Sequence, residues 1–391
     1  MPALSRHAYD IVIAGGGPIG AAVAIALQGS GLAVLVLEAR PDAGSSNDVR
    51  TLAMSYGSRL ILERLGIWPQ IESVTPIESI HVSQRGGFGR TLLSAREADL
   101  PALGYVVRYA GLQQAFGRAL ESEDTILMAG AEVTGMESTA EGVAIDYRRQ
   151  NTSQSIAARL LIIADGGASA GLRAGATVKV REYGQDAVVG LVETSQPHGY
   201  KAYERFTPDG PIALLPFENR YALVWTATPE TAGGLMGLPA KGFLEKLQQH
   251  FGDRAGRFMS IEARARFPLT LRYAADPVLP RTVMLGNAAQ ALHPIAGQGF
   301  NLGLRDAWEL GETLLLHGRL DPGSSECLSD YRAARRPDRL RGIALTHSLV
   351  KIFSNDSAPL QATRGAALAL LDLIPPAKRA FMQRMIFGAS R

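Results

Sequence analysis

The stretch from Tyr9 to Arg40 reads YDIVIAGGGPIGAAVAIALQGSGLAVLVLEAR. The β-branched run Ile11–Ile13 is bounded by glycines, which is typical of a buried parallel strand. A helix is expected from about Pro18 to Gln28, where two glycines end it. A second apolar strand, AVLVLE, ends at Glu38. The stretch therefore predicts a strand–helix–strand unit of the Rossmann type.

The turn of this unit carries the pattern Gly15-x-Gly17-x-x-Gly20, with Pro18 at the start of the helix. Gly15 permits a tight turn, and Gly17 lets a pyrophosphate reach the N–H groups at the helix N-terminus. Gly20 lets the helix pack closely on the strand. Glu38 lies 18 residues after Gly20, where a carboxylate accepts hydrogen bonds from ribose hydroxyls. These residues predict a dinucleotide site, and the acid favours FAD or NAD over NADP.

The composition bounds the class of protein. The chain has 391 residues, which suggests two domains with a terminal extension, and 46% hydrophobic and 20% charged residues are typical of a folded soluble protein. A single cysteine, Cys327, excludes an intramolecular disulfide and fits a reducing compartment. The most apolar run, Ile11–Leu27, is shorter than the ~20 residues of a spanning helix and is broken by glycines. We therefore expect a cytoplasmic protein.

Two later glycine-containing segments add to the first. The segment RLLIIADGGASAGLR (Arg159–Arg173) is an apolar strand followed by Asp165 and Gly166, which alone is consistent with any strand that ends in a turn. The segment GNAAQALHPIAGQGFNLGLRDAWEL (Gly286–Leu310) has four glycines among its first eighteen residues. Such a backbone has little side chain to bury, so we expect a ligand to approach it closely.

Read together, the three segments resemble the motifs of the group A flavoprotein monooxygenases, which have the para-hydroxybenzoate hydroxylase fold. The resemblance implies an α/β protein with a Rossmann-type FAD domain, an interleaved and mainly antiparallel β substrate domain, and a helical C-terminus. Independently, GPIALLPF and YALVWTAT, separated by ENR, predict a β-hairpin. The implied boundaries are 1–75, 101–175 and 276–330 for the FAD domain, 76–100 and 176–275 for the substrate domain, and 331–391 for the helical region.

The resemblance also assigns roles within the third segment. The glycine-rich loop is expected beside the flavin ring, with the N–H groups of about Gly297 to Asn301 facing its pyrimidine side. A helix N-terminus there stabilises the negative charge of reduced flavin. Pro294 is expected to stiffen the loop. The full set of expected FAD contacts is Gly15, Gly17, Pro18, Gly20, Glu38, Arg50, Gln113, Asp165, Asn287, Pro294, Gly297, Gln298, Gly299 and Asn301.

A narrower resemblance rests on HPIAGQGFNLGLRDA and YERFTPDGPIALLPFENRYALVWTATP, which are similar to the ubiquinone-biosynthesis hydroxylases. The chain departs from the wider family at Asn287, where an aspartate is usual. The Asn287 amide still accepts and donates hydrogen bonds but brings no charge, so we expect FAD binding to survive. Arg173 lies one residue later than the usual pattern places its arginine.

The resemblance implies FAD- and NAD(P)H-dependent hydroxylation of an aromatic ring by O2. The expected reaction converts 2-polyprenyl-6-methoxyphenol to 2-polyprenyl-6-methoxy-1,4-benzoquinol through a C4a-hydroperoxyflavin. The alternatives are hydroxylation of another ring carbon in the same pathway, or a non-catalytic prenyl-binding escort protein. One visible nucleotide unit implies that NADPH or NADH binds transiently.

Because the flavin carries the chemistry, we expect no catalytic triad and no metal. His293 is the candidate site histidine, either as a catalytic base or as a residue that structures the flavin loop and borders the substrate. Pro216 and Phe217 are expected either to line the substrate pocket or to pack within the sheet.

The C-terminal region is basic. From Tyr331 to Arg391 there are eleven Lys and Arg against three Asp, a balance of +8. The region also contains apolar stretches, a mixture typical of interfacial helices. We expect it to meet either the inner face of a membrane, where a polyprenyl substrate lies, or other enzymes of the pathway, and not nucleic acid.

Overall fold

The computed structural model describes residues 8–41, 48, 50–121, 125–167, 175–318, 320–353 and 358–388. Its first sheet is built around β1 (Tyr9–Ala14), which pairs in parallel with β2 (Val34–Glu38) and with β11 (Thr152–Ile163). The sheet continues in parallel to β8 (Thr125–Ala129) beyond β2 and to β18 (Thr282–Met284) beyond β11. Because these strands run in one direction, their carboxyl ends meet at one edge of the sheet.

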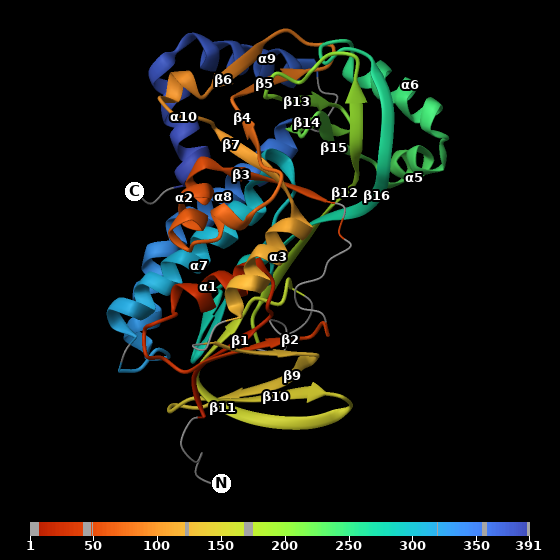
Figure 1. The fold of residues 1–391 in the computed structure, drawn as a ribbon. Coiled ribbons are helices and arrows are strands. Elements are labelled where there is room, and N and C mark those ends of the chain that lie inside the picture. Colours follow the sequence, from red (N-terminus) through yellow and green to blue (C-terminus); the bar gives the residue numbers. More distant parts are fainter. Residues whose placement is uncertain are drawn as a thin grey trace.

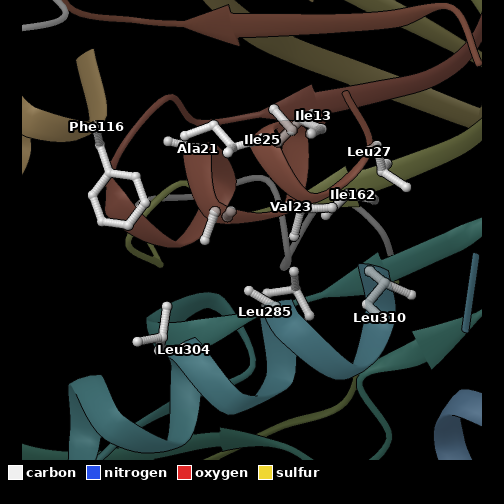
Figure 2. Packing of buried hydrophobic residues seen from close by; sticks show 14 of the residues in the cluster. Ile13, Ala21, Val23, Ile25, Leu27, Phe116, Ile162, Leu285, Leu304 and Leu310 are labelled. Atoms are coloured by element: carbon white, nitrogen blue, oxygen red, sulfur yellow. The ribbon is translucent and has the colours of Figure 1, made fainter. Parts of the chain in front are cut away.

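Helices cover one face of this sheet (Figure 1): α1 (Pro18–Ala26), α3 (Tyr109–Leu120) and α7 (Gln298–His317). Figure 2 shows α1 packed between the sheet and α7, with Val23 above Leu285. The other face is covered by an antiparallel extension of β11, made of β9 (Ala131–Ser138) and β10 (Val143–Arg149).

The elements expected around the first glycine turn are confirmed. The strand at Ile11–Ile13 lies within β1, and the second strand ends at Glu38 as expected. The first helix ends at Ala26, two residues before the predicted Gln28, because Leu27 already serves as its C-cap. Helix α7, which follows the glycine-rich loop, has one fully buried apolar face, formed by Leu304, Ala307, Leu310 and Leu314.

A second, mainly antiparallel sheet has the order β19-β16-β12-β15-β14-β13-β5-β6. The predicted hairpin is confirmed as β14 and β15, with a two-residue turn in which Glu218 has φ 53°. The strands of this sheet are β5 (Ser79–Gln84), β6 (Arg90–Ser94), β12 (Val178–Thr194), β13 (Lys201–Thr207), β14 (Gly210–Phe217), β15 (Arg220–Ala227), β16 (Phe258–Ala274) and β19 (Gln290–Ala291).

The chain passes between the two sheets more than once. Strands β5 and β6 come early in the sequence but join the second sheet, where β5 pairs in parallel with β13. A small third sheet of β3 (Thr51–Ser55), β7 (Gly104–Arg108) and β4 (Thr75–Ile77) lies between them in sequence and in space. Helices α5 (Pro229–Gly237) and α6 (Ala240–Phe251) cover the outer face of the second sheet (Figure 1). These two helices leave the inner face of this sheet uncovered.

Three C-terminal helices complete the described chain. Helix α8 (Ser325–Phe353) packs on α7, α9 (Ala358–Leu373) packs on β6, and α10 (Pro375–Phe387) packs on α2 (Tyr56–Arg64). Among the described residues, no helix combines the length and the apolar character needed to cross a membrane. The remaining short elements are β17 (Val278–Leu279), η1 (Trp68–Gln70), η2 (Arg96–Ala98), η3 (Gly286–Ala288) and η4 (Ile295–Gly297).

Candidate functional site

A cavity of about 410 Å³ opens at the carboxyl ends of β1, β2 and β11. Segments that are far apart in the sequence form its walls, as expected for a ligand at the edge of a parallel sheet. Eight of the predicted cofactor contacts line it: Gly15, Gly17, Pro18, Glu38, Arg50, Asp165, Asn287 and Gly299. Their contact with a cofactor stays a prediction, but the structure brings them to one place.

The glycine turn fits a closely bound phosphate group. A Cβ on Gly15, whose φ is 110°, would lie 2.5 Å from the carbonyl oxygen of Ala164, so a side chain there clashes with the neighbouring strand. A Cβ on Gly20 would lie 2.0 Å from the Gly15 oxygen, which explains the close helix–strand packing and keeps Gly20 beneath the cavity surface. Gly17 is different, since a Cβ added there would meet no atom of another segment within 4 Å. The space above Gly17 is thus open at the N-terminus of α1.

Glu38 is held at the end of β2 by donors on both sides. The N–H of Gly16 donates to one carboxylate oxygen at 2.8 Å, and the Arg40 Nε donates to the other at 2.9 Å. Burial alone would raise the pKa of Glu38, but these hydrogen bonds, chiefly from Arg40, hold it below the usual value. Glu38 therefore remains an acceptor facing the cavity. Sequence reasoning missed Arg40, whose only signal was its position just after the strand.

Arg50 reaches the cavity from the segment before β3. Its guanidinium pairs with Asp48 and lies 5.3 Å from the ring centroids of both Tyr109 and Phe267. These contacts fix a cation at the cavity wall, where it suits an anionic ligand. Tyr109 also lines the cavity and was not predicted, because an aromatic at the start of a helix carries no specific signal.

The second and third segments meet across the cavity from the glycine turn. Asp165 accepts a hydrogen bond from the Gly167 N–H at 2.8 Å, which closes the turn after β11. Arg173 lies outside the described residues. Asn287 stands exposed at the cavity wall within η3, next to Gly286, whose φ of 54° favours glycine.

The start of α7 separates this cavity from a second one. Asn301 is buried, and its side chain ties the loop to β3 and α2, because its Oδ1 accepts from the Ser55 N–H at 2.8 Å and the Ser58 hydroxyl at 2.7 Å. Its Nδ2 donates to the Gly297 oxygen at 2.6 Å. The amide we expected to contact the flavin is thus occupied in shaping the loop. Gln298 Nε2 donates to the Met385 oxygen at 3.4 Å, which connects the loop to α10.

The second cavity has a volume of about 510 Å³ and mostly apolar walls. It lies between the inner face of the second sheet, the start of α7 and the C-terminal helices. Residues of α9 and α10 such as Leu368, Met382 and Ile386 form one wall. Leu52, Gly299 and Phe300 border both cavities. The two cavities therefore adjoin, and Pro294, Gly297, Gln298 and Asn301 line the second rather than the first.

Besides Gly20, four predicted site residues line neither cavity. Gln113 is buried in α3. Pro216 is buried on β14 beside Leu215, which does line the second cavity, because successive residues of a strand face opposite sides. Phe217 is fully buried near the end of that strand, in a cluster with Val106 and beneath the Arg108 guanidinium at 4.9 Å. The positions of Pro216 and Phe217 therefore favour packing within the sheet over lining the substrate pocket.

His293 is the fourth. It is 1% exposed, and its Nδ1 accepts a hydrogen bond from the Ile295 N–H at 3.1 Å. Burial lowers the pKa of His293 to about 4, so the ring is neutral near pH 7 and is a weak base. This geometry favours the loop-structuring role. A part in catalysis stays a prediction.

A buried polar network behind the loop was not predicted. Gln290 donates to Asp306 at 2.6 Å, and Arg335 bridges Asp306 at 2.8 Å and Asp338 at 2.7 Å. Arg339 donates to the Gln290 oxygen at 3.1 Å. The network fastens the strand before the loop to α7 and α8. Charge counts in the sequence could not reveal it, because the partners come from three separate elements.

The arrangement fits FAD. Open space above Gly17, an acceptor at Glu38 and a cation at Arg50 match the pyrophosphate and ribose of a dinucleotide. A cofactor in the first cavity and an apolar compound in the second would meet at the border formed by Leu52, Gly299 and Phe300.

Comparison with known sequences agrees with this geometry. The family model described as "FAD binding domain" matches residues 8–341. A ubiquinone hydroxylase, UbiL, of Rhodospirillum rubrum is 36% identical over 96% of this chain and 88% of its own. The 3-demethoxyubiquinol 3-hydroxylase of Escherichia coli is 32% identical, over 93% of this chain and 95% of its own.

Solved structures share the fold. The p-nitrophenol 4-monooxygenase PnpA of Pseudomonas putida superposes with a TM-score of 0.80 at 18% identity, covering 98% of this chain and 99% of that one. The OxyS anhydrotetracycline hydroxylase of Streptomyces rimosus gives 0.70 at 23% identity, covering 96% and 75%. At these identities the likeness is one of fold, and it confirms the expected architecture.

Proposed function

This chain belongs to the FAD-binding domain family and is a flavoprotein monooxygenase, and we propose that it hydroxylates the ring of a polyprenylated phenol during ubiquinone biosynthesis. The observation that carries the proposal is the apolar cavity of about 510 Å³ that adjoins the FAD cavity. Its walls suit a ring with a hydrocarbon tail better than a small polar substrate. The names of the relatives support the pathway.

The bound FAD, once reduced by NADPH or NADH, supplies the activated oxygen from O2 that enters the ring. The chain contributes binding, orientation and exclusion of water. Gly17 and Glu38 hold the nucleotide portion, and the N-terminus of α7 faces the border of the two cavities, where its N–H groups favour negative charge. The apolar walls keep water from the reacting centre.

We assign the reaction specifically as conversion of 2-polyprenyl-6-methoxyphenol to the 1,4-benzoquinol. The third segment, with Asn287 in place of the usual aspartate, resembles the members with that activity. Hydroxylation of another ring carbon is the second candidate, and the 32% identity to a 3-hydroxylase favours it. An escort protein without flavin has less support, because the nucleotide cradle is intact.

We also propose that the chain meets a membrane surface. An exposed apolar tip is formed by the β5–β6 turn and α9, which pack together through Gly89 and Gly365. Arg90 and Arg254 lie beside it, lining a groove with Phe88 and Leu373. The apolar tip consists of Phe88, Leu92, Leu370, Leu373 and Ile374. Apolar residues flanked by arginines suit an anionic lipid surface.

The function is tested with the FAD-loaded protein. It is incubated with NADPH or NADH and a short-chain 2-prenyl-6-methoxyphenol, and the product is identified by mass spectrometry. We expect a gain of one oxygen at the para position. In a deletion strain, the 6-methoxyphenol should accumulate. Accumulation of a phenol without the methoxy group would instead assign an earlier ring position, and a colourless protein that takes up no FAD would overturn the proposal.

A further inference from the structure

One carboxyl group lies in the apolar wall of the second cavity. Glu204 of β13 lines this cavity, on the face of the sheet that looks toward the start of α7. Its cross-strand neighbours are Ala213 on β14 and Val82 on β5, and Val224 follows beyond Ala213. Its immediate neighbours across the sheet are therefore all apolar.

The carboxyl group of Glu204 makes no polar contact with the described residues. Within the described part of the chain, no hydrogen bond or ion pair involves its oxygens, and burial alone raises the pKa of Glu204 to about 7. Tyr203 also borders the cavity, but its hydroxyl donates to the Arg254 oxygen at 3.0 Å on the opposite face. A carboxyl group left in apolar surroundings destabilises the fold, so a function is the better explanation.

Charged groups on β5, α8 and α9 have contacts with partners other than Glu204. On β5, His81 contacts Arg254 at 2.9 Å on the outer face. On α8, His347 contacts Arg181 at 2.8 Å. On α9, Arg364 lies 5.9 Å from the Phe353 ring centroid, and Asp372 is paired with Lys378 of α10 at 3.0 Å. Strand β14 carries no ionisable side chain. None of these groups contributes to the shift at Glu204.

We propose that Glu204 is a catalytic base that accepts the proton of the substrate's phenolic hydroxyl while oxygen is transferred to the ring. This inference rests on the proposed function. The phenolic O–H bond breaks, its electron pair moves into the ring, and the proton forms a new O–H bond on Glu204. When the hydroxylated ring loses its C–H proton to water, Glu204 returns its proton to the ring oxygen, and the carboxylate is restored. A ring carbon forms a new C–O bond to one oxygen atom of O2, and the other oxygen atom leaves as water. Reduced FAD would supply the two electrons and return to its oxidised form.

Two properties of the site suit this role. A general base is most effective when its pKa lies near the working pH, because it is then largely ionised and still binds the proton well. The apolar wall also strengthens a hydrogen bond from the phenol to Glu204. Activity should therefore rise with pH through about 7, as Glu204 ionises.

The test compares Glu204→Gln with Glu245→Gln, a matched change at an exposed position on α6. Both are assayed as FAD-loaded enzymes with the short-chain 2-prenyl-6-methoxyphenol. For Glu204→Gln we expect kcat to fall ~10²-fold with a small change in KM, and the rise of kcat near pH 7 to disappear. Glu245→Gln should match the parent. If the parent hydroxylates and Glu204→Gln keeps its rate and pH profile, the inference fails alone; if the parent does not hydroxylate, the proposed function fails.

A stability measurement gives a readout independent of activity. Because the folded pKa of Glu204 lies above the unfolded value, the folded state binds an extra proton between about pH 4.5 and 7, and the parent loses stability as pH rises through that window. Glu204→Gln removes this loss. We expect it to melt above the parent at pH 8 and close to it at pH 4.5. A constant difference at both pH values would contradict an unpaired carboxyl group in the half-buried cavity wall.

Discussion

At the residue scale, two glycines of one turn make different demands. Gly15 has φ 110° and no room for a Cβ, whereas Gly17 has φ −68°, a conformation open to any residue, and free space above it. The fold requires the first glycine, and we expect the ligand to require the second.

This difference predicts opposite outcomes for two alanine substitutions. Gly15→Ala should destabilise the protein even without FAD, by at least the ~1–3 kcal/mol of a strained backbone. Gly17→Ala should leave the melting temperature of the FAD-free protein unchanged but weaken FAD binding by more than ~10-fold, because its methyl group occupies the space of the pyrophosphate. Thermal melting and titration of flavin fluorescence measure the two effects. Normal FAD affinity in Gly17→Ala would place the pyrophosphate elsewhere.

Two residues of the candidate site, Arg40 and Glu204, were not predicted from sequence motifs. The motif predicted Glu38 but not Arg40, which holds its carboxylate, because the pair depends on the local bend after β2. Glu204 carried no motif signal at all. A period of two along β13 would have placed it beside Ala202 and Phe206, on the face toward the cavity.

At the element scale, the flavin loop depends on the buried network behind it. Arg335 is 3% exposed and Asp306 is 2% exposed, so neither charge is solvated if the other is removed. Asp306→Asn should lower stability by about 3–5 kcal/mol. Glu63→Gln, which breaks the exposed pair with Arg59, should cost no more than about 0.5 kcal/mol. Denaturant unfolding measures the free energy of unfolding of both variants. Similar small changes in the two variants would show that the network does not stabilise the fold.

The C-terminal helices have a role that their composition did not reveal. Basic charge and apolar stretches predicted a surface helix, but α9 and α10 also form a wall of the second cavity. Removing residues 345–391 to test lipid binding would therefore open the cavity as well. Point substitutions on the exposed side of α9 separate the two roles.

At the scale of the whole molecule, the apolar tip lies at the end opposite β9 and β10 (Figure 1). Leu370 and Leu373 are 56% and 77% exposed there. The double substitution Leu370→Asp and Leu373→Asp should reduce co-sedimentation with anionic vesicles more than ~10-fold, because two apolar contacts are replaced by repelled charges. Hydroxylation of a short-chain phenol should persist.

The matched control for this experiment is Leu316→Asp with Leu320→Asp. These leucines are 75% and 90% exposed, and they lie at the end of α7 and just beyond it, away from the apolar tip. The control should bind vesicles like the parent. Equal binding by all three proteins would argue that the tip contacts another protein rather than lipid.

The residues themselves predicted the Rossmann unit and the β14–β15 hairpin, because each depends on neighbours in the chain or on a glycine pattern with one steric explanation. The choice of FAD and the helical C-terminus came from the family resemblance of segments far apart in the sequence, and both are confirmed. Tertiary structure alone decided that Gln290, Asp306 and Arg335 form one network, that Phe217 is packed away while Leu215 lines a cavity, and that Glu204 stands in an apolar wall. Those features depend on which elements pack together and on the face each strand turns inward, and short-range spacing does not encode such contacts.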